Sequence, residues 1–301
     1  MRLDRRLRVV AAVVAVAASY TNAWAGPRPE TDAKFSSPRH QVVVQVKLGK
    51  QGPYSMLLDT GTDRSVIDAT LASRLRAISD ATPHKGKGAG AQPAHAQGWD
   101  MVDLRIGGLH ADTVAAAALD LTRISNRLGV HLDGVLGYSF LRKWVVQIDY
   151  SRHHVRFYRD TPYWSGSESV EFEMTLDPED PTPRFRGRIN KREVEMLYDS
   201  GSSRSIGVPG RAIEFLGLKA AFAAATPDSA SGSGGGATRK GRVPLVEIGQ
   251  IRFTDVPCIF EVEGYGESWD PREPAGKIGG ALLEGIVVTL DYPHRTIRFE
   301  R

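Results

Sequence analysis

The sequence predicts an all-β protein with a few short helices, built from two similar halves. The ten residues MLLDTGTDRS at 56–65 recur as MLYDSGSSRS at 196–205, an offset of 140 residues. The run GVLGYSFLRKWVVQIDYSRHHVRFY at 134–158 aligns without a gap on GKIGGALLEGIVVTLDYPHRTIRFE at 276–300, an offset of 142 residues. Because order and spacing are kept along most of the chain, the pattern indicates a duplicated unit.

The strands are predicted from apolar residues that alternate with polar ones, as in a half-buried strand. In HQVVVQVKL at 40–48 the apolar residues that share one face are Val42, Val44, Val46 and Leu48. The turn GKQG at 49–52 then leads to a second strand that ends at Leu58. In the second half, INKRE at 189–193 is the equivalent turn.

Short helices are expected after each copy of the repeated motif. The first is ATLASRLR at 69–76, capped by Asp68, and the second is PGRAIEFL at 209–216, opened by a proline. Each half then ends in two strands joined by a two-residue turn, SR at 151–152 and PH at 293–294.

The boundary between the halves is expected where turn-forming residues cluster and the repeat restarts, in RDTPYWSGSE at 159–168. We therefore place the N-terminal lobe at residues 26–160 and the C-terminal lobe at residues 161–301.

The first 25 residues are predicted to be a cleaved secretory signal. Four arginines precede an apolar run at 9–18, and Ala23 and Ala25 supply small residues where a signal peptidase cleaves. The run is too short to span a bilayer, and it lacks the polar face of an amphipathic helix. No cysteine follows to suggest a lipid anchor. We expect an exported protein, periplasmic or secreted, without an integral membrane anchor after cleavage.

Charge and cysteine content exclude some classes of function. The net charge of +4 becomes +1 without the signal, which holds four Arg and one Asp. The sequence therefore offers no electrostatic case for a nucleic-acid partner. Cys258 is the single cysteine, so no intrachain disulfide can form, and its apolar neighbours predict a buried thiol. The eight histidines suggest no metal site, and no metal or organic cofactor is expected.

Asp59 and Asp199 occupy the same place in the two halves, each after an apolar strand. One Asp-Thr/Ser-Gly triplet alone would be an ordinary turn. A pseudo-twofold axis between the halves could instead bring the two carboxylates together. Two carboxylates about 3 Å apart cannot both ionise, so they share a proton and offer an acid and a base at once. Such a pair can activate a water against a carbonyl group.

The motif resembles that of the aspartic peptidases, the clan of the retropepsins and the pepsins. The family pattern is Asp-Thr/Ser-Gly-Thr/Ser, followed later in the same half by two apolar residues and a glycine. Here 59–62 pairs with Val135-Leu136-Gly137, and 199–202 pairs with Ile278-Gly279. The resemblance covers nearly the whole chain after residue 25. It implies a bilobal pepsin-like acid protease fold made of two fused retropepsin-like halves, in an exported bacterial form.

The resemblance implies that Asp59 and Asp199 are the catalytic dyad that holds the nucleophilic water. Thr60 and Ser200 would hydrogen-bond across the interface to the backbone of the opposite loop and hold the carboxylates in one plane.

The next residues of each motif would support the dyad. Gly61 and Gly201 would let the backbone turn tightly beside the carboxylates. Thr62 and Ser202 would donate their hydroxyls to the outer carboxylate oxygens.

Two Gly-rich stretches, around 86–90 and 232–236, would be flaps that close over an extended peptide. A phosphate cradle is the alternative for KGKGAG at 85–90, but no strand-to-helix context surrounds it. The insertion at 263–276 either shapes one wall of the cleft or is an ordinary surface loop.

One departure from the family pattern concerns the site. Lys277 stands where an apolar residue is expected, which could place a cation near the dyad. Two functions therefore stay open. The first is a monomeric aspartic endopeptidase that cleaves peptide or protein substrates between the lobes. The alternative is a catalytically idle peptide-binding module with the same fold. An enzyme competent only as a dimer is disfavoured by the intrachain duplication.

Overall fold

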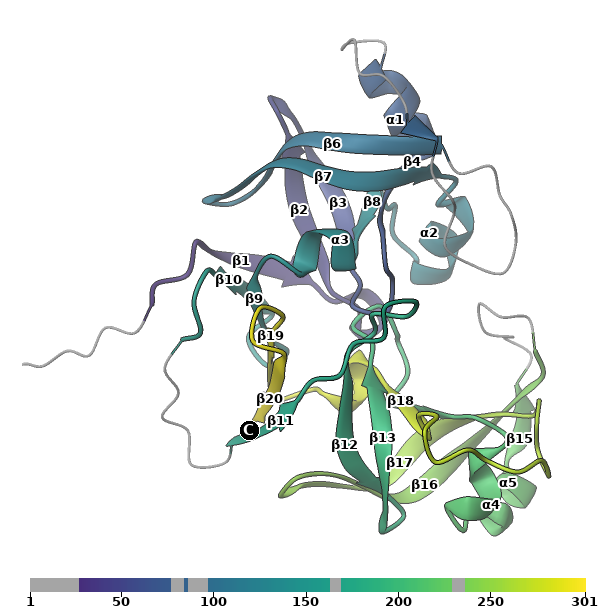
Figure 1. Cartoon of the computed structure of the whole chain (residues 1–301). Coiled ribbons are helices and arrows are strands. Elements are labelled where there is room, and N and C mark those ends of the chain that lie inside the picture. Colours follow the sequence, from purple (N-terminus) through teal and green to yellow (C-terminus); the bar gives the residue numbers. More distant parts are fainter. Residues whose placement is uncertain (1–26, 77–83, 86–96, 163–168, 229–235) are drawn as a thin grey trace, which may run out of the picture.

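The computed structural model describes residues 27–76, 84–85, 97–162, 169–228 and 236–301. The predicted signal lies outside these ranges, and so do the predicted flap at 86–90 and all but the last residue of the one at 232–236. The chain is mostly β and forms two similar halves, one above the other in Figure 1, with a layer of strands between them at one side. The predicted all-β duplicated fold is confirmed.

The first half is built from strands packed with three short α-helices and one 3-10 helix, which is labelled η1. The elements in chain order are β1 (Thr31–Ser36), η1 (Pro38–His40), β2 (Val43–Leu48), β3 (Gln51–Leu58), β4 (Ser65–Asp68), α1 (Ala69–Arg76), β5 (His84–Lys85), β6 (Gln97–Ile106), β7 (Leu109–Leu119), α2 (Thr122–Leu128), β8 (Gly134–Leu136) and α3 (Tyr138–Leu141).

The second half repeats the order of the strands, with two helices in place of α1 and, in the described residues, no counterpart of α2. Its elements are β12 (Arg184–Ile189), β13 (Arg192–Tyr198), β14 (Ile206–Val208), α4 (Ala212–Phe215), α5 (Lys219–Ala224), β15 (Thr226–Asp228), β16 (Thr238–Ile248), β17 (Ile251–Glu261), β18 (Gly276–Ile278) and η2 (Gly280–Leu282).

Most strand pairings of the first half have a counterpart in the second, although β1 pairs with β2 while β11 (Ser169–Glu173) and β12 belong to separate sheets. β3 pairs with β8 in parallel as β13 does with β18, and β4 pairs with β7 in parallel as β14 does with β17. The long hairpin of β6 and β7 corresponds to that of β16 and β17. The sequence repeat is therefore a repeat of topology.

Between the halves lies a platform of six antiparallel strands, to which each half contributes three (Figure 1). They run in the order β1, β10 (His154–Tyr158), β9 (Val145–Asp149), β19 (Val287–Asp291), β20 (Thr296–Glu300) and β11 (Ser169–Glu173). At the centre Gln147 pairs with Thr289, its own counterpart in the repeat. The pseudo-twofold axis that relates the halves therefore passes between these two residues.

Burial follows the alternation expected from the sequence. Val42, Val44 and Val46 are fully buried in the main core, whereas Gln45 and Lys47 on β2 are exposed. A second, smaller cluster packs under α2 and reaches the cleft described below. Its buried members are Val43, Leu57, Leu121, Leu128, Leu132 and Val135.

The structure contains the predicted helix cap at Asp68 and, with a different length, the predicted turn between β9 and β10. Asp68 caps α1, because its Oδ1 accepts hydrogen bonds from the N–H groups of Thr70 and Leu71 at 2.9 and 3.2 Å. The turn between β9 and β10 is longer than predicted, since β9 ends at Asp149, whose carboxylate accepts the N–H of Arg152 at 2.9 Å.

In the part of the chain that the structure describes, no helix is long and apolar enough to cross a membrane.

Candidate active site

Asp59 and Asp199 are fixed at the ends of buried strands. The N–H of Asp59 donates to the carbonyl of Leu136 on β8, and the N–H of Asp199 donates to that of Ile278 on β18, both at 3.0 Å. These are equivalent contacts in the two halves. The backbone of each aspartate, directly after the end of its own strand, is therefore fixed by a hydrogen bond to a neighbouring strand.

The loops that follow the aspartates are bonded to each other across the interface. The N–H of Thr60 donates to Oγ of Ser200 at 3.1 Å, and the N–H of Ser200 donates to Oγ1 of Thr60 at 2.9 Å. Both hydroxyls also donate to carbonyls of the opposite half, Thr60 to Tyr198 at 3.0 Å and Ser200 to Leu58 at 2.7 Å. Both side chains are fully buried. All four hydrogen bonds join one half to the other.

This arrangement brings each carboxyl group against the glycine of the opposite loop. A Cβ on Gly61 would lie 2.7 Å from Cγ of Asp199, and one on Gly201 would lie 2.3 Å from Cγ of Asp59. The N–H of Gly61 donates to Oδ1 of Asp59 at 2.8 Å, and that of Gly201 donates to Oδ1 of Asp199 at 2.9 Å. Glycine is required here because a side chain would occupy the place of the opposing carboxyl.

The hydroxyls of Thr62 and Ser202 take partners other than those expected from the resemblance. Thr62 donates to the carbonyl of Arg64 at 3.4 Å, and Oγ of Ser202 accepts the N–H of Arg204 at 3.4 Å. Within the described ranges, neither hydroxyl bonds to a dyad carboxylate. Each contact is to a residue two positions along the same loop. The hydroxyl of Thr62 gives its proton to a local carbonyl and not to a carboxylate, whereas that of Ser202 acts as an acceptor.

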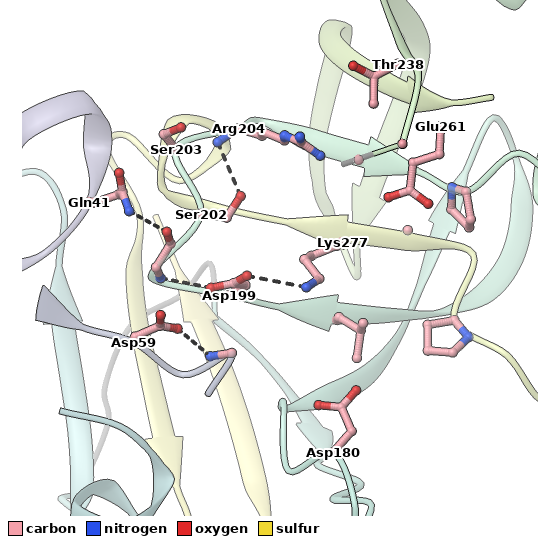
Figure 2. A pocket seen from close by; sticks show the side chains of 18 of the residues that line it. Gln41, Asp59, Asp180, Asp199, Ser202, Ser203, Arg204, Thr238, Glu261 and Lys277 are labelled. Atoms are coloured by element: carbon pink, nitrogen blue, oxygen red, sulfur yellow. Dashed lines mark hydrogen bonds and ion pairs between the residues drawn. The ribbon is translucent and has the colours of Figure 1, made fainter. Parts of the chain in front are cut away.

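The protonation of the pair depends on burial, on the charges of neighbouring groups and on a hydrogen bond. Burial and the negative charge of Asp199 raise the pKa of Asp59 to about 8, while the N–H of Gly61 and the charge of Lys277 act in the opposite direction. Nζ of Lys277 lies 3.5 Å from Oδ2 of Asp199. Figure 2 shows the ion pair with the lysine side chain extended along the cleft toward the aspartate.

The two aspartates lie at the floor of a cleft of about 750 Å³ that both halves line (Figure 2). The side chain of Gln41 crosses from the first half and donates to the carbonyl of Gly201. Around the dyad the first half lines the cleft with Leu57, Ile124, Arg127, Leu128 and Val135. The second half lines it with Asp180, Arg184, Leu197, Ser203, Arg204, Thr238, Glu261 and Lys277. Part of the predicted insertion also contributes, through Glu263, Glu273, Pro274 and Gly276.

A family model described as "Aspartyl protease" matches residues 44–140 and 185–266, which include both motifs. The chain belongs to the aspartyl protease family. A comparison with curated proteins finds no match.

Solved structures support the fold of this aspartyl protease family member. The chain is similar to Basic 7S globulin from soybean, with a TM-score of 0.50 and 11% sequence identity. The similarity covers 89% of this chain and 93% of that one. Agreement over both halves confirms the pepsin-like two-lobed arrangement.

Beneath the dyad, this member of the family buries tyrosines that the sequence analysis did not assign to the site. The hydroxyls of Tyr150 and Tyr198 lie 2.8 Å apart, and burial raises the pKa of both phenols. Tyr292, the counterpart of Tyr150, has a buried hydroxyl with no hydrogen-bond partner in the described structure. The sequence signal was the one change from Leu to Tyr between MLLD and MLYD, at Leu58 and Tyr198.

No metal site is evident in the described ranges, where no three His, Cys, Asp or Glu residues gather in a group able to hold an ion.

Proposed function

We propose that the protein is an aspartic endopeptidase, which hydrolyses peptide bonds with a water activated by Asp59 and Asp199. The observation that carries the proposal is the pair of interlocked loops, since each carboxyl is held against the glycine of the other half. A cleft lined by both halves gives an extended peptide access to this pair.

The chemistry needs one proton shared between two carboxyl groups. A water held between them gives one proton to the ionised carboxylate as its oxygen attacks the peptide carbonyl carbon. The protonated carboxyl gives its own proton to the carbonyl oxygen, so the tetrahedral intermediate carries two hydroxyls and no net charge. When the intermediate collapses, the C–N bond breaks, the amine leaves with a proton from one carboxyl of the dyad, and a hydroxyl of the intermediate returns a proton to the other carboxylate. The new carboxyl group keeps the oxygen of the water.

The raised pKa of Asp59 supports a mechanism in which one carboxyl is the acid and the other is the base, because a carboxyl that keeps its proton near neutral pH can act as the acid. We further propose export of the chain after removal of residues 1–25, and action on peptide or protein substrates as a monomer. The duplication supports action as a monomer, since one chain supplies both aspartates.

The second candidate is a peptide-binding module that keeps the fold without turnover. The ion pair between Lys277 and Asp199 favours it, because that cation competes with the water for the carboxylate. A binder, however, has no chemical need for two opposed carboxyls with a shared proton, so the peptidase remains the better explanation.

The test uses residues 26–301 and a diverse peptide library, incubated between pH 3 and 8 and read by mass spectrometry. The control is the double variant Asp59→Asn, Asp199→Asn, which keeps the shape of the cleft. The peptidase predicts new peptide termini with the parent chain only. Retention of library peptides by both proteins, without any cleavage, favours the binding module.

A further inference from the structure

Lys277 makes the two halves of the site differ in charge, although its backbone occupies the same position as the equivalent residue of the first half. It lies on β18, opposite Leu197 of β13 on one side and Gly207 of β14 on the other. Its counterpart, Val135 on β8, lies in the same way between β3 and β4. Because strands flank Lys277 on both sides, its backbone is fixed in relation to the dyad.

The two side chains at this position meet different surroundings. Val135 is 4% exposed and packs in the apolar cluster with Leu57 and Leu128. The side chain of Lys277 is 45% exposed and directs its amino group at Asp199, 3.5 Å away. Asp59 has the apolar valine in the equivalent place. The dyad therefore has a cation beside one carboxyl and a hydrocarbon beside the other.

The other charged groups near the dyad do not reproduce this asymmetry. Arg184 is engaged by Asp177, Asp180 and Glu195 at 3.5 to 3.8 Å. Further charged residues line the cleft without an ion pair to either aspartate in the described structure, namely Arg127, Arg204, Glu261, Glu263 and Glu273. The phenols below the dyad stay neutral, because burial raises the pKa of Tyr150, Tyr198 and Tyr292.

We propose that Lys277 is a positioning residue that fixes the single negative charge of the dyad on Asp199, so that Asp59 carries the shared proton. The proposal rests on the hydrolysis proposed above and assigns its two roles. Asp199 takes the proton of the attacking water, and Asp59 gives its proton to the carbonyl oxygen. The lysine touches neither the water nor the scissile bond in this scheme, and acts only through Asp199.

A fixed cation has a definite effect on the pH dependence. It stabilises the singly ionised dyad over the neutral one, and the doubly ionised dyad over the singly ionised one. Both limbs of a bell-shaped pH profile therefore lie at lower pH with Lys277 than without it. If Lys277 had only a structural role, its replacement would lower activity by the same factor at every pH.

The experiment compares the pH dependence of kcat/KM for residues 26–301 and three variants, on a cleaved peptide without ionisable side chains. Lys277→Met and Lys277→Val remove the charge, and Lys277→Arg keeps it. We expect both limbs to move up by about one pH unit in the first two variants and to stay in place in the third. Lys219→Met is the control for net charge, since Lys219 is an exposed residue of α5 paired with Glu214. Its profile should match the parent.

Two results would overturn the proposal. The first is a profile whose limbs stay in place in Lys277→Met, whether activity falls or not. The second is an equal shift in Lys219→Met, which would indicate a general charge effect.

The proposal can fail separately from the proposed function. If the parent cleaves nothing, the titration of the carboxyl carbons of Asp59 and Asp199 can be followed by NMR after selective ¹³C labelling of aspartate. The proposal then predicts that the first ionisation occurs at Asp199 and moves up by about one pH unit in Lys277→Met. First ionisation at Asp59 would contradict it.

Discussion

Thr60 and Ser200 each accept the backbone N–H of the other through a side-chain hydroxyl, at 2.9 and 3.1 Å, with both side chains fully buried. The pair is what joins the two aspartate loops at the axis of the duplication. Because each hydroxyl also donates to a carbonyl of the opposite half, each is satisfied only while the halves are docked.

Removal of either hydroxyl should destabilise the protein. Thr60→Ala or Ser200→Ala leaves buried N–H and C=O groups without partners, so we expect a loss of about 1–3 kcal/mol in the free energy of unfolding. The double variant should lose less than the sum, because both residues belong to one network. Denaturant unfolding of the four proteins measures this coupling. Thr60→Ser keeps the hydroxyl and is the control, and a strictly additive double variant would contradict a shared network.

Loss of the hydroxyl should destabilise the protein at Tyr150 but not at Tyr292. Tyr150→Phe leaves the buried hydroxyl of Tyr198 without a partner, so stability should fall by about 1–3 kcal/mol. Tyr292→Phe removes a hydroxyl that has no partner, so stability should stay the same or rise. Thermal and denaturant unfolding of the matched pair gives the comparison. Equal losses in both variants would mean that the Tyr150–Tyr198 hydrogen bond contributes nothing.

Stability should decrease as the pH rises through the neutral range. The pKa of Asp59 is raised from 3.8 to about 8, so the folded protein keeps a proton that the unfolded chain releases. This contribution is complete below about pH 4 and is lost as the pH rises toward 8, at up to about 1 kcal/mol per pH unit. Asp59→Asn stays neutral in both states and should flatten the dependence. The free energy of unfolding of the parent and of Asp59→Asn, measured at five pH values, tests this prediction. If stability changed with pH equally in both proteins, the raised pKa of Asp59 would be contradicted.

The glycines of the motif should tolerate no side chain. In Gly61→Ala the new methyl would lie 2.7 Å from Cγ of Asp199, and in Gly201→Ala it would lie 2.3 Å from Cγ of Asp59. The carboxyls must move apart, and a displacement of about 1 Å costs on the order of 100-fold in rate. Steady-state kinetics with a circular dichroism check of folding measures the effect. Folded variants with unchanged kcat would contradict the close approach.

The sequence predicts the duplicated topology because the repeat preserves both strand alternation and motif spacing. It also points to Asp59 and Asp199, since a turn motif repeated at equivalent places needs a common purpose. It does not predict the partners of Thr62 and Ser202, because a hydroxyl can donate to a local carbonyl, as Thr62 does, or accept a local N–H, as Ser202 does, instead of donating to a carboxylate. Contacts between distant segments, such as Gln41 with Gly201 or Tyr150 with Tyr198, become visible only when the halves are docked.

The most direct measurement is the cleavage rate of the single variants Asp59→Asn and Asp199→Asn beside residues 26–301, on one peptide that the parent cleaves. If the carboxyls form one site, each substitution alone abolishes cleavage, because neither an acid nor a base is sufficient without the other. Both variants should still unfold cooperatively. Full activity in either single variant would contradict a shared dyad.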